Sequence, residues 1–190
     1  MTEKEPIPYI SLVMRHDNLL PAPVPPLPQG YSIRLFRPGE ELAWADIVTD
    51  AGEFQTTGEA LSYFTEHFSG CFEQLADRCL FLVDAAGKPV GTATGWFAEG
   101  APSVGRLHWV VIAKAHQGRR LCKPLVVAAM NRMAALGHKT GILTTQPKSW
   151  KGIKVYAGCG WVPDRDSSDE ARRGWEITED LAGPLPGSCR

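Results

Sequence analysis

A single junction constrains the fold of this chain more than any other: a buried-strand pattern runs into a polar turn and then into a long helix. The strand pattern is the almost unbroken apolar run Trp109 to Ile112, typical of a central strand covered on both faces. Beyond the turn, apolar residues recur on one helical face at Leu121, Leu125, Ala129, Met133 and Leu136. Gly137 is the predicted end of this helix, and Pro124 fits in its first turn. The junction therefore predicts an α/β unit.

The segments on either side extend this pattern. Alternating or apolar runs bounded by turn residues predict strands, and apolar residues at helical spacing predict helices. The predicted strands cover residues 31–36, 79–83, 89–98, 103–113 and 140–146, with two more at 161–162 and 172–178. The predicted helices begin near Pro38, Gly58, Arg119 and Ser149. The three central strands follow one another closely, so an antiparallel meander is expected there. A strand, a helix and a strand over 103–146 predict a parallel pair with a right-handed crossover.

The length and composition favour one soluble domain preceded by an arm. The chain has 190 residues, which suffice for a single sizeable core. Residues 1–30 form the arm, because "PAPVPPLPQG" is a stiff extended linker, and residues 31–190 form the domain. The net charge of −1 provides no global field for nucleic acid or an acidic membrane. No run of eighteen apolar residues and no signal-like start occur, which predicts a cytoplasmic protein.

Neither the cysteines nor the histidines form a metal-binding pattern. The five cysteines lack CxxC spacing and are interpreted as reduced thiols: Cys71, Cys79, Cys122, Cys159 and Cys189. Cys159 in "YAGCGW" is an alternative nucleophile, but no histidine lies close to it in sequence. The five histidines are scattered without an HxxxH pair, so no metal site is expected.

The turn after the strand is a candidate anion site. A helix N-terminus offers unpaired N–H groups and a positive dipole end. Gly118 allows close approach of the backbone, and three cationic side chains surround it, Arg119, Arg120 and Lys123. A solvated basic first turn is the alternative interpretation. The GxxxxGK[ST] pattern is absent, which disfavours a nucleotide-hydrolysing P-loop.

The order of the elements and two motifs resemble the GNAT superfamily of acetyl-CoA-dependent N-acyltransferases, over roughly residues 31–178. Gln117 to Cys122 is similar to the family's Q/R-x-x-G-x-G/A turn, with Arg120 and Cys122 where Gly and Gly/Ala are usual. "SWKGIKVYAGCGW" is similar to the family's late helix and supplies Ser149, Tyr156 and Gly160-Trp161 at the matching places. The resemblance implies an α/β (α+β) fold with a mixed, mostly antiparallel sheet of about six to seven strands and about four helices. The sheet is expected to splay between its fourth strand and its fifth.

The resemblance also implies where acetyl-CoA binds. The cosubstrate would lie in the gap beside the fourth strand, with its pantetheine arm paired to the backbone of Val110, Val111 and Ile112. The pyrophosphate would lie on the turn, which spans Gln117, Gly118, Arg119, Arg120, Leu121, Cys122 and Lys123. Ser149 stands where the family usually has an Asn that contacts the coenzyme.

Two catalytic groups follow from the same resemblance and from the strand pattern. Tyr156 is the expected general acid, which protonates the departing thiolate. His108 is the candidate general base: alternation places it on the same strand face as Arg106 and Val110, and by the resemblance it lies close to where many family members have a carboxylate. Glu53 and Glu99 are alternatives for the base, and the family also works without one when the amine arrives neutral.

The expected reaction is acetyl transfer to a primary amine of a small molecule by direct attack in a ternary complex. Phe54, Trp96, Phe97 and Trp175 are candidates for an apolar wall around the acceptor. The loop between the first two helices and a C-terminal hairpin would help to select it. A non-catalytic acyl-CoA-binding sensor or interaction module with the same fold is the competing interpretation. A homodimer is left open, because dimers are common in the family.

Overall fold

The computed structural model describes residues 6–187. The chain divides into two compact units, one made of Met1–Asp17 with Ile142–Arg190 and the other of Asn18–Gly141. The described residues form seven strands and six α-helices. Four pairs of neighbouring strands, β1 with β7, β2 with β3, β3 with β4 and β4 with β5, are antiparallel. The predicted mixed α/β class with a mostly antiparallel set of strands is thereby confirmed, with two more helices than expected.

The larger unit, Asn18–Gly141, is built on a four-stranded antiparallel sheet. Its strands are β2 (Ser32–Leu35), β3 (Cys79–Val83), β4 (Pro89–Ala98) and β5 (Ala101–Ile112), and they lie side by side in that order. The predicted meander is confirmed, because β3, β4 and β5 are connected by short turns. The longest pairing joins β4 to β5 and runs from Gly91 opposite Ile112 to Ala98 opposite Ala101.

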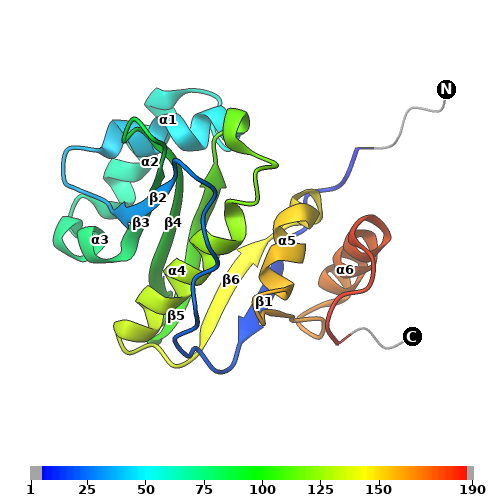
Figure 1. Cartoon of the computed structure of the whole chain (residues 1–190). Coiled ribbons are helices and arrows are strands. Elements are labelled where there is room, and N and C mark those ends of the chain that lie inside the picture. Colours follow the sequence, from blue (N-terminus) through cyan, green and yellow to red (C-terminus); the bar gives the residue numbers. More distant parts are fainter. Residues whose placement is uncertain (1–5, 188–190) are drawn as a thin grey trace. The chain divides into compact units, whose positions relative to one another are not determined.

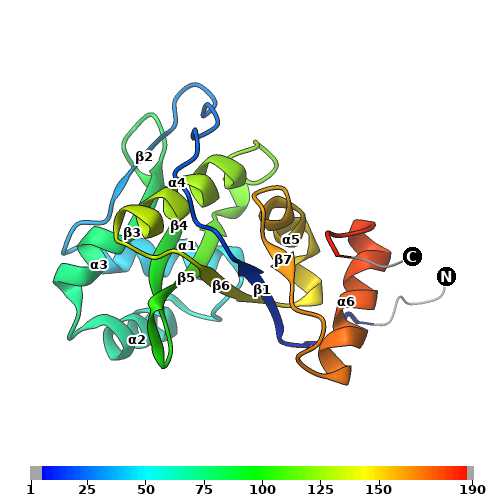
Figure 2. The same cartoon turned by 90° about the horizontal axis from the view of Figure 1, so that it is seen from below.

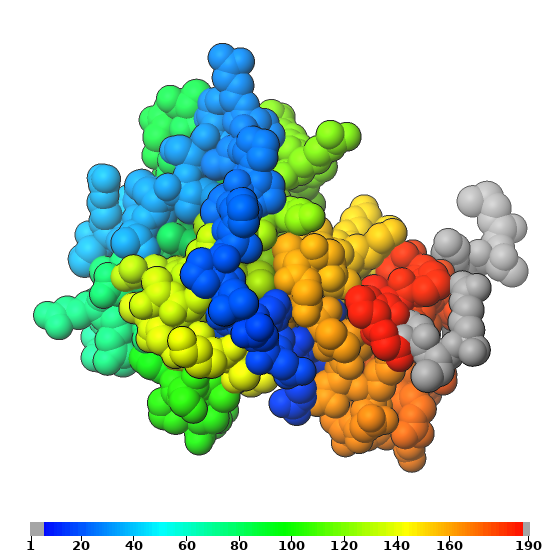
Figure 3. All heavy atoms as spheres, turned by 60° about the horizontal axis from the view of Figure 1, so that its bottom comes forward, coloured from blue at the N-terminus to red at the C-terminus, as the bar shows by residue number. Residues whose placement is uncertain are grey.

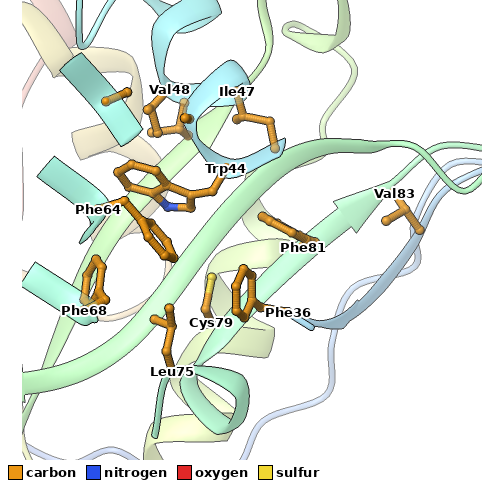
Figure 4. Packing of buried hydrophobic residues seen from close by; sticks show 13 residues of the cluster. Phe36, Trp44, Ile47, Val48, Phe64, Phe68, Leu75, Cys79, Phe81 and Val83 are labelled. Carbon is orange, nitrogen blue, oxygen red and sulfur yellow. The ribbon is translucent and has the colours of Figure 1, made fainter. Parts of the chain in front are cut away.

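Three helices and one face of this sheet enclose the main core of the larger unit. They are α1 (Glu41–Ala51), α2 (Thr57–Phe68) and α3 (Phe72–Arg78). Helix α2 begins at Thr56, whose hydroxyl accepts a hydrogen bond from the Glu59 N–H at 3.2 Å. Figure 4 shows Trp44 and Phe64 turned toward each other over β3, with ring centroids 5.0 Å apart. Since alternate residues of β3 enter this cluster, Leu80 and Leu82 face the other side of the sheet.

Helix α4 (Cys122–Ala135) packs against β4 and β5 on the side of the sheet away from α2 (Figure 2). Two glycines allow this close approach. A Cβ atom built at Gly95 would lie 2.6 Å from Cγ of Met133, and one at Gly105 would lie 2.5 Å from its Cε. Met133 is fully buried between these positions. The helix therefore packs directly against the strand backbone at these two glycines.

The proline-rich arm is fixed to the outer surface of the larger unit from Asn18 onward. Asn131 of α4 exchanges two hydrogen bonds with the backbone of Ala22, at 2.7 and 2.8 Å. The Leu19 N–H donates to the Lys139 carbonyl at 2.7 Å, and the Leu19 side chain is buried. In Figure 3 this segment is the blue line of spheres that runs across the face shown. Residues 21–28 of the predicted linker contain no helix or strand, while the arm over residues 1–30 as a separate part of the chain stays a prediction.

The smaller unit contains three short strands, a 3-10 turn and two helices (Figure 1). They are β1 (Leu12–His16), β6 (Gly141–Thr145), β7 (Val162–Pro163), the turn Pro147–Ser149, α5 (Trp150–Ala157) and α6 (Asp169–Ala182). Strand β1 lies between β6 and β7 and pairs antiparallel with β7. Helix α6 packs tightly on β1, because a Cβ atom at Gly174 would lie 2.8 Å from Ile10 and Leu12 side-chain atoms.

Two sequence predictions are wrong in detail. The segment 172–178, predicted to be a strand in a C-terminal hairpin, belongs to α6. Ser168 caps this helix through a hydrogen bond from the Ala171 N–H, and the buried residues follow helical spacing at Ala171, Gly174, Trp175 and Thr178. Helix α3 was not predicted, because seven residues are too short for a helical period to stand out.

Several predictions concern features that the structure does not test. They are the single domain over residues 31–190, the parallel crossover and the splay after β5, and these stay predictions. Among residues 6–187, no helix combines the length and the apolar character needed to cross a membrane.

Candidate active site

The turn between β5 and α4 has a backbone suited to an anion. Gly118 has a φ of +75° and Arg120 a φ of +62°, so two residues of the turn are left-handed. For a residue with a side chain this conformation costs about 1–2 kcal/mol. Arg120 thus adopts the conformation that a glycine adopts easily, at a position where its side chain is exposed to solvent. Backbone strain of this kind is concentrated at functional sites.

The N-terminus of α4 directly follows this turn. The helix begins at Cys122, three residues later than predicted, and Pro124 lies in its first turn as expected. The N-cap Leu121 makes no side-chain capping bond, and no acidic residue stands in the first turn. The first N–H groups of the helix and its positive dipole end therefore have no capping side chain. Arg119, Arg120 and Lys123 are all exposed around them.

Contacts within the larger unit hold the turn in place. Gln117 donates from Nε2 to the Ile112 carbonyl at 2.8 Å, which ties the turn to the end of β5. Arg119 donates to the Tyr31 hydroxyl at 3.3 Å, and that hydroxyl lies 2.9 Å from Nδ1 of His116. His116 belongs to a short 3-10 helix, Lys114–His116, that the sequence did not predict. Tyr31 precedes the turn by more than 80 residues, so no local pattern could link the two.

Strand β5 contains a bulge in its middle. Thr94 pairs with His108 and Thr92 with Val111, so Ala93 alone faces both Trp109 and Val110. Trp109 has a φ of +51°, the left-handed conformation of the first residue in one common type of bulge. The bulge leaves the backbone of Val110 outside the regular ladder with β4. Val111 and Ile112 resume the pairing, opposite Thr92 and Gly91.

The bulge also changes which side chains share a face with His108. Strict alternation places Val110 with Arg106 and His108, and this prediction is wrong, because one extra residue in a strand reverses the phase beyond it. The register puts Val111 on the face of His108 instead, since Thr92 and Thr94 share one face of β4. Val111 accordingly belongs to the core beneath α1 and α2.

A pocket of about 390 Å³ lies between α2 and the β4–β5 hairpin. Six of its nine lining residues carry an aromatic ring, if the two histidines are included. Ala98 and Glu99 line it at the end of the hairpin. The lining residues are Tyr63, His67, Phe68, Trp96, Phe97, Ala98, Glu99, Arg106 and His108. The rings are closely packed, with centroids 5.2 Å apart for Phe68 and Trp96 and 5.5 Å for Trp96 and Phe97. The pocket is large enough for a small molecule with an apolar body.

Basic groups dominate the polar part of the pocket. Arg106 and His108 extend from the same face of β5, and Arg106 pairs across the hairpin with Trp96. His67 follows Tyr63 by one helical turn, and the two rings stack with centroids 3.8 Å apart. Nδ1 of His67 lies 2.9 Å from the Tyr63 carbonyl, which can only accept, so this nitrogen carries the proton. Glu99 is the one carboxylate among the lining residues.

Burial and neighbouring charge act strongly on His108. Burial lowers the pKa of His108 to about 3, and the positive Arg106 and His67 add to this effect. The imidazole is therefore neutral at neutral pH and can accept a hydrogen bond, but it holds a proton less tightly than a free histidine does. Burial raises the pKa of Tyr63, so its hydroxyl also stays neutral.

One buried nitrogen donor at the pocket, Nε of Arg106, has no hydrogen-bond partner among the described residues. Nε1 of Trp109 is buried as well, and the Trp109 side chain interacts with the Tyr63 hydroxyl. Trp109 packs edge-on to His108 and to Tyr63, with both ring centroids 5.2 Å away. A buried donor without an acceptor is costly, and it marks a place where a ligand or water can bind.

Tyr156 and Ser149 belong to the smaller unit. Ser149 is the N-cap of α5 and makes no side-chain capping bond there. Tyr156 lies in the last turn of α5, over Gly152, where a Cβ atom would stand 3.5 Å from the Tyr156 hydroxyl oxygen. The following Gly160 has a φ of +91° and no room for a Cβ atom beside His16. Trp161 is fully buried and packs edge-on against His16, which explains the Gly-Trp pair at the end of the motif.

The remaining candidates fall outside this pocket. Trp175 lies in the core of the smaller unit, where its indole N–H donates to the Asp164 carbonyl at 2.9 Å, so it is not part of the wall. Phe54 packs on Trp109 and Trp44 rather than lining the pocket. Glu53 is exposed in the loop between α1 and α2.

The cysteines among the described residues form no disulfide. This holds for Cys71, Cys79, Cys122 and Cys159, while Cys189 lies outside the described residues. Burial raises the pKa of the Cys79 thiol, which makes it unreactive. No group of three potential metal ligands occurs within residues 6–187.

Comparison with known proteins shows the family to which the chain belongs. The model of the acetyltransferase (GNAT) family matches residues 43–161, a range that includes the turn, the pocket and α5. A mycothiol acetyltransferase from Sanguibacter keddieii is 28% identical over 149 residues, which are 74% of this chain and 46% of that protein. The chain thus spans about half the length of the curated relatives it matches.

Solved structures share the fold. A GCN5-related N-acetyltransferase from Sphaerobacter thermophilus superposes with a TM-score of 0.60 at 21% identity and covers 88% of this chain and 49% of that one. A diaminobutyrate acetyltransferase from Paenibacillus lautus, in complex with its substrate L-2,4-diaminobutyric acid and coenzyme A, has a TM-score of 0.55 at 15% identity. That match covers 68% of this chain and 74% of the other.

Proposed function

The chain belongs to the acetyltransferase (GNAT) family, and we propose that it transfers an acetyl group from acetyl-CoA to the primary amine of a small molecule. One observation carries this proposal: a turn with two left-handed residues precedes an uncapped helix N-terminus and is surrounded by three cationic side chains. Such a turn binds phosphate oxygens through backbone N–H groups. The pocket between α2 and the β4–β5 hairpin, at the other end of β5, would provide the space for an acceptor.

The turn would hold the pyrophosphate of the coenzyme. Gly118, Leu121 and Cys122 offer backbone N–H groups, while Arg119, Arg120 and Lys123 add positive charge. Gln117 has a different role, because its side-chain amide donates to the end of β5 and positions the turn. The contact of Arg119 with Tyr31 orients one of the arginines before the coenzyme binds.

The pantetheine arm would pair with backbone groups of β5. Val110 lies in the bulge and is not part of the regular ladder with β4, so its backbone is a candidate partner for the pantetheine amides. Val111 and Ile112 follow at the end of the strand. A backbone N–H in this region would also stabilise the negative charge that develops on the thioester oxygen.

The chemistry would be a direct attack within a ternary complex. The amine nitrogen bonds to the thioester carbon, the carbon–sulfur bond breaks, and the thiolate of coenzyme A leaves. We assign the proton for this thiolate to the Tyr156 hydroxyl, as its place in the motif supports. The proton lost by the amine passes to His108 or to water beside it. The low pKa of His108 favours a role in orienting the amine over one in storing its proton. Ser149 is proposed as a contact of the coenzyme.

The acceptor is proposed to be small. The diaminobutyrate acetyltransferase of similar fold acts on an amino acid with a free primary amine. The pocket of about 390 Å³ has a volume suited to a molecule of that class or somewhat larger. A cytoplasmic location and a homodimer stay predictions.

A melting-temperature series tests the coenzyme part of the proposal. Acetyl-CoA and coenzyme A are expected to raise the melting temperature in a saturable manner, and ATP is not, because only a ligand of the folded state stabilises it. Release of free thiol with a panel of primary amines then tests turnover. Stabilisation without thiol release for any amine would favour the non-catalytic acyl-CoA-binding module. No shift at millimolar acetyl-CoA would overturn both.

A further inference from the structure

The pocket between α2 and the hairpin contains an unused positive charge. Arg106 lines the pocket, and none of the ion pairs or hydrogen bonds of the described residues involves its side chain. Its Nε is fully buried and has no acceptor. Glu99 lines the same pocket, but it is exposed and forms no ion pair with Arg106. Because an unpaired buried guanidinium N–H is costly, Arg106 is matched to an anion that the protein itself does not supply.

The phosphates of the coenzyme are not that anion. Arg106 stands six residues before Ile112, where β5 ends and the turn follows. At about 3.4 Å per residue, roughly 20 Å of strand separates it from the cationic turn. The turn has its own arginines, Arg119 and Arg120. Arg106 therefore serves the pocket at the other end of the strand.

The walls around Arg106 favour an apolar body. Phe68, Trp96 and Phe97 form a continuous aromatic surface, with successive ring centroids 5.2 and 5.5 Å apart. Trp96 lies directly opposite Arg106 across the hairpin. A ligand whose carboxylate pairs with Arg106 would place its side group against these rings. Aromatic surfaces of this size bind flat or branched apolar groups.

Building on the proposed acetyl transfer, we infer that the acceptor is an α-amino acid or related amine, in which a carboxylate bound by Arg106 is attached to an aromatic or branched apolar side group. A guanidinium and a carboxylate form the strongest type of neutralising pair available in such a site. His108, two residues further along the same face of β5, stands beside the amine.

Such a substrate also acts on His108. Burial is the largest cause of its low pKa, and the charges of Arg106 and His67 lower it further. The titratable groups that surround it are Arg106 on its own strand, His67 and Tyr63 on α2, and Glu99 at the hairpin end. A bound carboxylate offsets the charge of Arg106 and raises the proton affinity of His108. The base then gains strength only when the correct substrate is present.

Three ligands with the same phenyl group test this inference: L-phenylalanine, 3-phenylpropionate, which lacks the amine, and 2-phenylethylamine, which lacks the carboxylate. Calorimetric titration into the protein, with and without coenzyme A, is expected to show the two carboxylates binding at least tenfold more tightly than the amine. Arg106→Met is expected to weaken both carboxylates by about 10- to 100-fold, the range of a charge-assisted pair, and to leave the amine unchanged. Arg106→Lys keeps the charge and is expected to recover part of this loss.

Matched controls separate recognition from folding and from catalysis. Arg37→Met removes an exposed arginine outside the pocket and should change nothing, while the melting temperature of each variant reports on folding. Equal binding of all three ligands, or carboxylate binding unchanged in Arg106→Met, would overturn the inference. Thiol release with 2-phenylethylamine but not with phenylalanine would overturn it too, yet retain the acetyl transfer. If carboxylates bind through Arg106 but no amine gives thiol release, the recognition of the carboxylate is supported and the proposed acetyl transfer is overturned.

Discussion

The turn after β5 and the pocket beside α2 are built in opposite ways. The turn depends on backbone conformation, with Gly118 and Arg120 in left-handed geometry and three cationic side chains exposed around it. The pocket depends on side chains that three segments, α2, β4 with its turn and β5, bring together, and Nε of Arg106 within it is fully buried. A site made of consecutive backbone groups tolerates changes of side chain, whereas a site made of converging side chains depends on each of them. This difference suits a common coenzyme and a selective acceptor.

The largest effect is expected from a change that belongs to neither region. Replacing Tyr156 by Phe should lower kcat by about 100-fold or more, because general acid catalysis contributes at least this factor. KM for acetyl-CoA and KM for the acceptor should stay the same, because Tyr156 would act on the chemical step and on neither binding site. The rate of thiol release under saturating substrates measures this. An unchanged kcat would remove Tyr156 from the mechanism.

The pocket should destabilise the fold in acid. The pKa of His108 is about 3 in the folded protein and near 6.5 when unfolded, so the unfolded chain binds the proton more tightly. Stability is then lost as the pH falls from about 6.5 toward 3, and at pH 4 the loss is roughly 3 kcal/mol. Urea unfolding at pH 7 and pH 4 should show a smaller loss for His108→Gln. Equal pH dependence in both proteins would contradict the shielded position of His108.

The turn should respond to charge reversal in a different way. Arg119→Glu with Arg120→Glu is expected to weaken acetyl-CoA by about 30-fold, since two charge-assisted contacts are lost at an exposed site. Acetyl-pantetheine, which lacks the phosphates, should bind the variant and the unaltered protein equally well. Isothermal titration with both ligands gives the comparison. An equal loss for both would mean that the variant is damaged in general.

The smallest effect separates backbone from charge within the turn. Arg120→Gly relieves the left-handed strain and should stabilise the fold by about 1 kcal/mol, measured as the free energy of unfolding in urea. Acetyl-CoA affinity should fall only slightly, if the N–H groups carry most of the binding. Arg119→Gly, in contrast, removes an arginine that is not strained and should not stabilise. A large loss of affinity in Arg120→Gly would show that the turn, like the pocket, depends on its side chains.

Local sequence predicted most of the fold and the turn. Strand alternation, helical spacing and glycine positions located β2 to β6 and four of the six helices within a few residues. The turn that we propose as an anion site could be located because strand, glycine and helix are neighbours in sequence. The N-cap Ser168 and the acidic first turn of α6 were a readable signal for a helix, but the short apolar spacing at 172–178 was interpreted as a strand.

The pocket could be predicted only in part. Trp96, Phe97 and His108 were recognised as candidates, but Tyr63 and His67 lie on α2, and only tertiary packing brings that helix over the hairpin. The helical spacing of this pair shows that they share a face and does not show what the face covers. The bulge at Trp109 is equally invisible, because Trp is among the least expected residues for a positive φ.

The two glycines beneath α4 limit which substitutions the gene can tolerate at these positions. Gly95 and Gly105 have no side chain and so allow α4 to pack directly on the strand backbone. This helix begins at the turn after β5. A single base change that gave either glycine a side chain would displace this helix near Met133, about three turns from its first residue. The change would lie in the strands, yet we expect it to weaken binding of the coenzyme that we propose for the turn at the other end of the helix. On that proposal, a ligand that contacts neither glycine would restrict variation at both positions.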